Sequence, residues 1–479
     1  MTWLMQVMSR IRGLEVKTRN HSLVSRKNIQ IEAIRKRDEV QSCSSKDDVE
    51  KKQIIDLLIK LPPLFKLFEV HRKIGEGTFS SVYLGSLRNH SGKSVSEKRL
   101  FAIKHLVPTT HPARVEQELK CLQEIGGKEN VIGVELCLRN LDSIVFVMPY
   151  IPHTKFSELV GNMDAEELRQ YMRALFIALR HVHSFGVIHR DIKPSNFLYD
   201  RENRRYLLVD FGLAQRVCPA PDAGPPPAHT NGPYKRIREE DEFTSEAKRL
   251  ALDLTTGSKT SGAARGPGRA PPAPQPAPSR GGRCRCLGAG GVCAECAARP
   301  AARAPRAGTQ GFRPPEVLLK CAAQGTAVDT WAAGVVLASV LCARYPFFRA
   351  SDDASALAEQ LELLGSRALQ RAAAALGRRV LASRARPGLC LRKLSARLRG
   401  PAPPPGPAPP APPCRGCRLA PSRCLCRDER VPAAWFQPGG TTASFPDSAF
   451  SLAAQLLEPD PSLRLSAAAA LRHAFLATD

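Results

Sequence analysis

The sequence predicts an α+β fold whose body is interrupted by two long low-complexity insertions. Short apolar runs typical of buried strands, such as Ile144 to Met148, occur along the chain together with longer runs of helical periodicity, such as the one after Asp164. Residues 216–306 and 364–430 differ from both kinds of run, because they are rich in Pro, Ala, Gly and Arg. At 479 residues, the chain is also larger than one ordinary domain.

The net charge of +25 belongs mainly to these two insertions. Residues 216–306 hold 15 Lys and Arg against 8 Asp and Glu, a net charge of +7, and residues 364–430 hold 15 against 2, a net charge of +13. Only +5 remains for the rest of the chain. The insertions could therefore engage nucleic acid or acidic protein tails, although charge runs are more often simply solvated.

Cysteine usage favours a reducing intracellular compartment. Eight of the 15 cysteines lie in two tight clusters, and the others are scattered singly. We expect no export signal, because the amino terminus has no charged-then-apolar pattern, and no membrane span, because the apolar helix Trp331 to Ala343 is too short. Clustered cysteines in such a compartment suggest metal binding rather than disulfides.

The first predicted element of the body is a helix. Residues 1–48 are polar and basic without sustained periodicity, so we expect a disordered tail there. Apolar residues then recur at helical spacing up to Pro62-Pro63, which ends the helix; they are Ile54, Ile55, Leu58 and Leu61. We expect this helix to pack on the start of the body, and binding to a partner is the less favoured alternative.

A glycine-rich stretch, K-I-G-E-G-T-F-S-S-V-Y-L, follows this helix. Gly75 and Gly77 allow the backbone to approach phosphates, and Ser80 is still small enough to permit this at the third position. Val82 would cover an adenine ring. Such a stretch is a weak signal alone, but F-A-I-K follows about twenty residues later and places Lys104 where it could pair with phosphates.

F-A-I-K resembles the V-A-I-K strand of protein kinases, and this resemblance implies a carboxylate partner for Lys104 on the next helix. Glu118 is the favoured candidate, because Leu119 and Leu122 flank it at the spacing of a core-facing helix. Glu116 is the alternative, and it would lie on a different face of the helix.

The strand Ile144 to Met148 ends at Pro149-Tyr150-Ile151, and a long helix follows. Asp164 and Glu167 form a capping-box pattern at its start, and Gly186 ends it. The apolar stripe of this helix predicts a core position and consists of Leu168, Met172, Leu175, Leu179 and Val182.

The residues from His189 to Gly212 carry the predicted chemistry: H-R-D-I-K-P-S-N-F-L-Y, a short connector and L-L-V-D-F-G. Asp191 could accept a proton from an attacking hydroxyl, and Lys193 places a cation beside it. Asn196 and Asp210 offer oxygen ligands for hard metal ions. A base, a cation and two metal ligands are what phosphoryl transfer requires, because its transition state demands positioning and charge neutralisation.

These motifs resemble the catalytic loop and the metal-binding loop of protein kinases. The resemblance implies a bilobal protein kinase fold, with a small β-rich N-lobe at 49–149 that includes the preceding helix and a larger, mainly helical C-lobe at 150–479. It implies Asp191, Lys193, Lys104 and Glu118 as catalytic residues. It also implies ATP and Mg²⁺ at Gly75, Gly77, Ser80, Val82, Ala102, Lys104, Met148, Pro149, Tyr150, Ile151, Asn196 and Asp210.

Kinase character resumes after the first insertion at G-T-Q-G-F-R-P-P-E-V-L. Thr309 matches the Thr that commonly contacts the catalytic Asp. Pro315-Glu316 match the end of the A-P-E motif, and Pro314 replaces its Ala. Asp329 resembles the buried Asp that binds the catalytic-loop backbone, and Arg464 resembles the Arg that pairs with Glu316.

Four cysteines near the end of the 216–306 insertion predict a zinc site: Cys284, Cys286, Cys293 and Cys296. Two close pairs of thiolates suit tetrahedral zinc, although the Arg-, Gly- and Ala-rich surroundings leave compositional drift as an alternative. The 364–430 insertion holds a mirrored array in a Pro-Ala-Arg tract, and we rank it lower as a metal site; it consists of Cys414, Cys417, Cys424 and Cys426.

Within the kinases, the chain resembles the cell-division-cycle kinases that form the catalytic subunit of DDK, the Dbf-dependent kinase. The resemblance rests on G-E-G-T-F-S-S-V-Y-L, D-F-G-L-A-Q and G-T-x-G-F-R-x-P-E-V-L around a long cysteine-bearing insertion. It implies a nuclear Ser/Thr kinase that is activated by a regulatory subunit of the activator-of-S-phase-kinase type and starts DNA replication by phosphorylating acidic tails of the MCM helicase. The alternatives are a pseudokinase scaffold and a protein that binds nucleic acid through its basic insertions.

Substrate choice is predicted from the loop before the A-P-E motif, which in kinases receives the side chain after the phosphorylated residue. Arg313 lies in this loop and Arg306 just upstream, so we expect a preference for an acidic residue or phosphoserine after the target. The alternative is that Arg313 turns to solvent or pairs with a structural partner.

Overall fold

The structure is a computed structural model of the 479-residue chain. It describes residues 46–77, 79–88, 99–107, 111–217, 305–400, 413–415, 417–419, 423–427 and 445–477. Residues 1–45 of the predicted tail and most of the insertion at 216–306, including Cys284, Cys286, Cys293 and Cys296, lie outside these residues, whereas residues 46–48, also predicted as tail, are helical.

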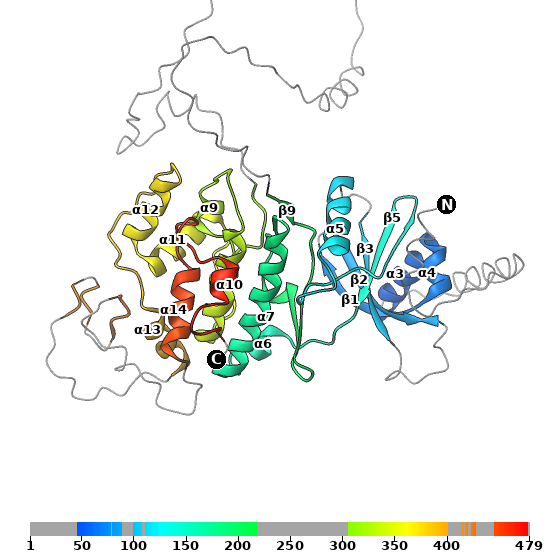
Figure 1. The fold of residues 1–479 in the computed structure, drawn as a ribbon, viewed down its shortest axis with the longest axis horizontal. Helices are drawn as coiled ribbons and strands as arrows, with labels where there is room; N and C mark the ends of the chain where they lie inside the picture. The colour runs from blue at the N-terminus through cyan, green and yellow to red at the C-terminus, as the bar shows by residue number, and fades with distance from the viewer. Residues whose placement is uncertain are drawn as a thin grey trace, which may run out of the picture. The chain divides into compact units, whose positions relative to one another are not determined.

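The amino-terminal lobe is built on one antiparallel sheet of five strands (Figure 1). Its spatial order is β1-β2-β3-β5-β4. Strands consecutive in the chain are therefore neighbours in the sheet, except that β5 lies between β3 and β4. The strands are β1 (Phe68–Gly77), β2 (Ser80–Leu87), β3 (Leu100–Leu106), β4 (Leu136–Asn140) and β5 (Ser143–Pro149). The register pairs Val82 with Lys104 and Ala102 with Met148.

Three helices accompany this sheet: α3 (Lys46–Lys60), α4 (Pro62–Leu67) and α5 (Pro112–Glu124). The helix predicted from the spacing of Ile54 to Leu61 is α3, and Pro62 begins α4 instead of simply ending the helical run. This is physically reasonable, because proline lacks the N–H that the first turn of a helix leaves unpaired. Leu57, Leu61 and Leu64 are buried with β1 and β3 residues in a core of their own.

The carboxy-terminal lobe is mainly helical, as predicted (Figure 1). Its helices are α6 (Phe156–Leu159), α7 (Ala165–Ser184), α9 (Pro315–Leu318), α10 (Ala327–Leu341), α11 (Asp353–Leu364), α12 (Ser366–Ala375), α13 (Leu391–Arg399), α14 (Asp447–Leu456) and α15 (Ala467–Ala470). α10 packs against both α7 and α14 and is buried along nearly its whole length.

α7 begins where the capping pattern predicts. The Asp164 side chain accepts a hydrogen bond of 2.7 Å from the backbone N–H of Glu167 and so satisfies a donor that the first turn leaves unpaired. Leu168, Met172 and Leu175 on its apolar stripe are buried in the main core. The helix thereby gives the catalytic loop that follows it a rigid base.

Short strands hold the loops that carry the chemistry. β6 (Val187–Ile188) pairs with β9 (Gln215–Arg216), and β7 (Phe197–Asp200) pairs with β8 (Arg205–Leu208). The residues between β6 and β7 include the 3₁₀ turn η3 (Pro194–Asn196). The β6–β9 ladder therefore joins the two ends of the segment from His189 to Gly212, and the β7–β8 hairpin lies within it.

The second insertion differs from the prediction. Inside 364–430, the structure forms α12 and α13, and Leu369, Ala372 and Leu391 are buried in the main core. Ala and Arg are good helix formers, so this composition allows helices. The helices are hard to predict because only a few larger apolar residues mark the buried face. No helix in the described ranges has the length and apolar character needed to cross a membrane.

Candidate active site

A buried ion pair joins the sheet to helix α5. Lys104 lies on β3 and its Nζ is 2.6 Å from Oε1 of Glu118, with both side chains less than one-tenth exposed. Glu118 is therefore the partner of Lys104, whereas Glu116 is exposed and pairs with Lys120. Burial opposes the charge on Lys104, but Glu118 and Asp210 outweigh it and raise the pKa of the ammonium.

Asp210 is the second partner of Lys104, at 2.8 Å, and its side chain is 44% exposed. Burial alone would raise the pKa of Asp210, but the Lys104 ammonium outweighs this and holds the pKa below its usual value. Asp210 has a φ of +70°, a conformation rare for residues with a side chain. Such strain persists only where the surroundings impose it, and here it points the carboxylate into the space beside Lys104.

The Asp191 carboxylate is surrounded by donors. Its Oδ2 accepts hydrogen bonds from Asn196 Nδ2 at 2.9 Å and pairs with Lys193 Nζ at 2.8 Å. Its Oδ1 accepts from the Oγ1 of Thr309 at 2.6 Å and from the backbone N–H of Thr309 at 3.1 Å. Lys193 also donates to the Thr309 hydroxyl at 2.8 Å. Residues 118 positions apart thus meet in one network.

A buried carboxylate supports the catalytic loop from behind. Asp329, on α10, accepts hydrogen bonds of 2.8 Å from the backbone N–H groups of His189 and Arg190. Arg190 has a φ of +68°, so Asp329 stabilises a strained turn. His183 also contacts Asp329, at 2.9 Å, and the His189 ring lies against Phe211. These contacts orient Asp191 and connect the loop to the helical core.

Several of the predicted nucleotide residues lie on neighbouring strands of the N-lobe sheet. Gly75 pairs with Val82 and Gly77 pairs with Ser80 across the β1–β2 hairpin, and Val82 and Ala102 are partly exposed on neighbouring strands. Met148 is buried at the end of β5. This places a surface of small and apolar side chains beside Lys104, which suits a flat aromatic ring with attached phosphates.

Tyr150 lies in the connection between the lobes, where its backbone is predicted to contact the nucleotide. Its backbone N–H donates to the carbonyl of Leu100 at 3.3 Å, so it is already used in the sheet. Bonding alternates along an antiparallel pair, so the flanking Pro149 carbonyl and Ile151 N–H point away from β3. We expect these two groups, and not the Tyr150 N–H, to be the backbone contacts available to a ligand.

The donor set fits Mg²⁺ and a polyphosphate. Asp210 keeps a carboxylate with a lowered pKa next to a cation, and the Asn196 amide donates through nitrogen to Asp191 and keeps its oxygen for a metal ion. The site holds the charge pattern that phosphoryl transfer needs: an ammonium for phosphates, oxygen ligands for the metal and a separate carboxylate for the hydroxyl.

The sequence analysis missed Asp353, at the start of α11. Arg306 Nε lies 2.8 Å from Oδ2 of Asp353, and Arg313 Nη1 lies 3.0 Å from Oδ1. Arg313 also donates to the Gly308 carbonyl at 3.0 Å. No local pattern could have found this cluster, because Asp353 is 40 residues beyond Arg313.

Gly308 explains how this cluster comes close to the catalytic loop. Its φ is +101°, and a Cβ at this position would lie 2.8 Å from the carbonyl oxygen of Arg190. Only glycine permits this approach. Thr309, the next residue, then reaches Asp191, which links the arginine cluster to the catalytic carboxylate.

A buried ion pair fixes the end of this loop. Arg464 makes a bidentate pair with Glu316, at 2.7 and 3.0 Å, and both side chains are almost completely buried. The structure therefore brings together Glu316 and Arg464 as the sequence motif predicts.

Comparison with known proteins agrees with this geometry. The family model described as "Protein kinase domain" matches residues 68–227 and 291–476. The chain is 36% identical to "non-specific serine/threonine protein kinase Cdc7" of Drosophila melanogaster, over 88% of this chain and 76% of that protein.

Two mammalian proteins are similarly related. The "Cell division cycle 7-related protein kinase" of Mus musculus is 34% identical over 89% of this chain and 93% of its own length, and that of Homo sapiens is 35% identical over 73% and 74%. The bilobal kinase fold predicted from the motifs is thus confirmed. Because both the kinase motifs and the similarity extend along most of the chain, this protein belongs to the protein kinases and, within them, to the Cdc7 serine/threonine kinases.

Proposed function

We propose that this kinase acts in the nucleus, is activated by a regulatory subunit and promotes the initiation of DNA replication by phosphorylating acidic tails of the MCM helicase. Its relatives are named as Cdc7 or cell-division-cycle kinases, which supports a role in the cell cycle. The observation that carries the substrate proposal is the convergence of Arg306 and Arg313 on one carboxylate next to the catalytic loop.

The residues have distinct roles in the proposed reaction. Asp191 accepts the proton of the substrate hydroxyl or orients it, and Lys193 stabilises the charge that develops beside it. Lys104 holds the ATP phosphates, and Glu118 holds Lys104. Asp210 and Asn196 would bind Mg²⁺, which supplies charge neutralisation to the phosphates when bound.

The arginine cluster supports recognition of an anion after the target residue. Asp353 shows that two guanidinium groups can meet at a single carboxylate there. The Arg313 side chain is 15% exposed and Arg306 is 58% exposed, so the cluster is open on one side. A substrate carboxylate or phosphate would join this cluster and share the arginines with Asp353. Asp353 is thus a structural partner of Arg313, which is the alternative considered for this arginine. In the proposed function, Asp353 positions Arg313 for the substrate.

The regulatory subunit is proposed to act on the activation segment. The Lys104–Glu118 ion pair already forms within this chain, which favours the activation segment over the helix that carries Glu118 as the place where the partner acts. The segment between Gly212 and Thr309 is very long, and we propose that a partner is needed to hold it in a substrate-binding arrangement. The proposed zinc site at Cys284, Cys286, Cys293 and Cys296 belongs to this segment.

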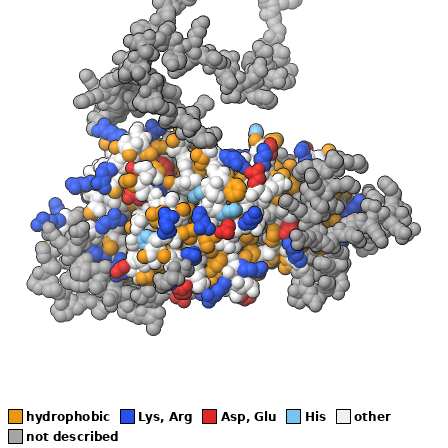
Figure 2. All heavy atoms as spheres, viewed as in Figure 1, with side chains coloured by type: hydrophobic (Ala, Val, Ile, Leu, Met, Phe, Trp, Pro, Cys, Tyr) orange, Lys and Arg blue, Asp and Glu red, His pale blue; other side chains and the backbone are white. Residues whose placement is uncertain are grey.

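Nucleic-acid binding remains a second candidate only for the basic insertions. Figure 2 shows Lys and Arg side chains distributed over the visible face with acidic side chains among them. Residues 216–306 and 364–430 hold +20 of the net charge of +25, so a contact with chromatin or DNA would depend on them and would weaken steeply with salt.

The test is a peptide series in which only the residue after the target serine varies, among Asp, phosphoserine, Ala, Pro and Arg. Wild-type chain, co-expressed with its regulatory subunit, should prefer the two anions by at least about tenfold, because charge-assisted hydrogen bonds contribute about 1.5–3 kcal/mol. Arg313→Ala should lose this preference and still phosphorylate the Ala peptide. Arg349→Ala, a change at an exposed arginine, is the matched control and should keep it.

Two further measurements complete this test. Asp191→Asn provides the background, and its turnover should fall roughly a hundred- to ten-thousand-fold. The isolated, dephosphorylated wild-type chain should be nearly inactive. Equal rates on the Ala and Asp peptides would contradict the substrate proposal, and robust activity of the isolated chain would contradict the need for a regulatory subunit.

A further inference from the structure

Four cysteines of the second insertion gather in the structure although the sequence analysis ranked them lower as a metal site. The Sγ atoms of Cys414, Cys417, Cys424 and Cys426 all lie within 4.8 Å of one another. Cys414, Cys424 and Cys426 are buried, Cys417 is partly buried, and none of the four is in a disulfide. They form a small cluster separate from the main hydrophobic core.

Local backbone structure explains why the first two thiols lie together. The Arg418 N–H donates to the Cys414 carbonyl at 2.7 Å, and the Cys414 N–H donates to the Leu419 carbonyl at 2.9 Å. Arg418 has a φ of +59°. The chain therefore turns sharply just after Cys417 and returns past Cys414, a tight turn that brings both thiols to one side.

The other two thiols come from an extended arm. Cys426 forms an antiparallel bridge with Leu389, and residues two apart in extended chain lie on the same face. Cys424 and Cys426 therefore present their thiols together. A turn that supplies one pair and an extended arm that supplies the other can surround a single ion.

This cluster is attached to the C-lobe by several contacts. The Cys390 N–H donates to the Leu425 carbonyl at 2.9 Å, and the Arg427 N–H donates to the Gly388 carbonyl at 3.0 Å. Lys393, on α13, donates to the Cys426 carbonyl at 3.2 Å and is 2% exposed. The cysteines thus lie on the folded body, at the start of α13.

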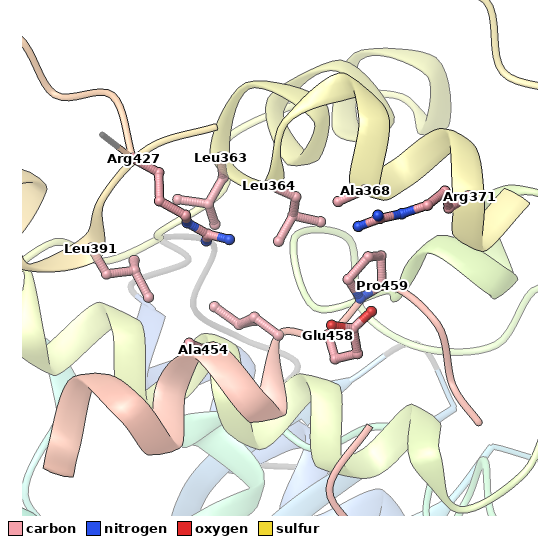
Figure 3. Close-up of a pocket in the computed structure, with 10 residues that line it drawn as sticks. Leu363, Leu364, Ala368, Arg371, Leu391, Arg427, Ala454, Glu458 and Pro459 are labelled. Carbon is pink, nitrogen blue, oxygen red and sulfur yellow. The ribbon is translucent and has the colours of Figure 1, made fainter. Parts of the chain in front are cut away.

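Arg427 extends this attachment into a pocket of about 120 Å³ (Figure 3). Its side chain lies on the same side of the pocket as Leu363 and Leu391, and Glu458 lies on the opposite side. The residue directly after the cluster is therefore packed among α11, α13 and the segment that follows α14.

The chemistry of four adjacent thiols favours a cation. Four thiols within reach of one another can lose their protons to a zinc ion and bind it together. Four thiolates around a divalent zinc ion carry a net charge of −2, which the buried Lys393 ammonium complements. Tetrahedral zinc with Zn–S bonds of about 2.3 Å places its sulfurs about 3.8 Å apart, which is compatible with the observed spacing.

We propose that Cys414, Cys417, Cys424 and Cys426 bind one zinc ion in a tetrahedral structural site that fastens the end of the second insertion to the start of α13. Binding forms four Zn–S bonds and releases the four thiol protons to solvent, with no change in oxidation state. The site is closed, since all four positions are filled by protein, so its role is structural and not catalytic.

The test measures zinc in the full-length chain carrying Cys284→Ser and Cys286→Ser, so that the first cluster does not contribute. This parent protein, expressed with ample zinc, should contain one zinc ion per chain. Adding Cys424→Ser and Cys426→Ser should remove it. Adding Cys390→Ala instead is the matched control, because Cys390 neighbours the cluster without belonging to it, and the zinc should remain. A parent without zinc, or four substitutions that leave the zinc content unchanged, would overturn the proposal.

A second measurement needs no substitution in the second cluster. The same parent protein, reconstituted with Co²⁺, should show the absorption of tetrahedral thiolate-bound cobalt, and chelation should lower its melting temperature. Cobalt spectra of octahedral type, or a mass showing disulfides among these four cysteines in protein purified under reducing conditions, would refute the site. Kinase activity is not needed for either readout, so the result is independent of the proposed function.

Discussion

Lys104–Glu118 and Arg464–Glu316 are both buried ion pairs, but they use their hydrogen-bonding capacity differently. Arg464 donates to both oxygens of Glu316 and to the carbonyls of Ala327, Glu458 and Pro459, so all three guanidinium nitrogens are engaged in fixed contacts. Lys104 is shared between Glu118 and Asp210, and Asp210 is 44% exposed.

The exposure of the partner groups indicates whether a buried ion pair is structural or takes part in the chemistry. The Arg464 pair lies wholly in the C-lobe and its side chains are at most 1% exposed, so it can fix the geometry of the loop that ends at Glu316. The Lys104 pair opens onto the site through Asp210, which a metal ion can approach. A compact ammonium can be shared between several anions, whereas a guanidinium fork suits one planar partner.

The largest expected effect is on stability and comes from the structural pair. Arg464→Ala would leave Glu316 buried without its counter-charge and should lower the free energy of unfolding by about 3–5 kcal/mol. Chemical denaturation, monitored by circular dichroism, would measure it. Arg464→Lys is the control and should recover only part of the loss, since an ammonium cannot pair bidentately. A loss below about 1 kcal/mol would show that the pair is not structural.

Lys104→Met should mainly affect activity. Loss of a preorganised cation at the phosphates should reduce turnover by roughly 10²- to 10³-fold, by analogy with removal of one transition-state donor. Steady-state kinetics on the complex would measure it, with circular dichroism to show that the variant folds. Glu116→Gln removes only an exposed pair with Lys120 and should leave turnover unchanged. Turnover close to wild type in Lys104→Met would contradict the role of Lys104 at the phosphates.

The pH dependence of stability should distinguish Glu118 with and without its Lys104 partner. Burial raises the pKa of Glu118 even with Lys104 present, and in Lys104→Met nothing opposes this effect. The folded variant would then bind more protons than the unfolded chain above about pH 4.3, so its stability should fall as pH rises, by about 1.4 kcal/mol for each pKa unit of the shift. Unfolding curves between pH 4 and pH 8 would measure the slope. Adding Glu118→Gln should flatten it, and an unchanged slope in that double variant would assign the effect elsewhere.

The hydrogen bond from the Thr309 hydroxyl to Asp191 should have the smallest effect on activity. Thr309→Ala removes the hydroxyl that donates to Asp191 at 2.6 Å, but the Thr309 N–H and Lys193 still contact this carboxylate, so the loss should be only about 0.5–1.5 kcal/mol. The expected fall in kcat is about two- to tenfold, and Thr309→Ser should restore it. A fall as large as that of Lys104→Met would mean that Thr309 organises the whole loop.

Much of the site could be predicted because its residues follow local patterns. Glycine spacing, the Lys104 strand and the loop from His189 to Gly212 each carry residue types that phosphate, metal and hydroxyl chemistry require. Helix α7 could be predicted for a similar reason, since a cap and a periodic apolar stripe are both local signals.

The missed features depend on long-range contacts. Asp353 meets Arg306 and Arg313 only because α11 packs near the loop that contains Gly308. α12 and α13 were assigned to an insertion because few large apolar residues mark their buried faces. Cys414 to Cys426 were ranked below Cys284 to Cys296, since a sequence pattern does not show that the second array rests on the folded body.

Local sequence patterns are enough to identify this chain as a kinase with its chemical groups present, because each group must be a particular residue type at a particular local spacing. Only the packing of distant segments shows which other groups meet: Asp353 with the two arginines, and four thiols at the start of α13. The physical reason is that electrostatic pairing falls off over a few ångströms, and only packing of distant segments brings groups within that range.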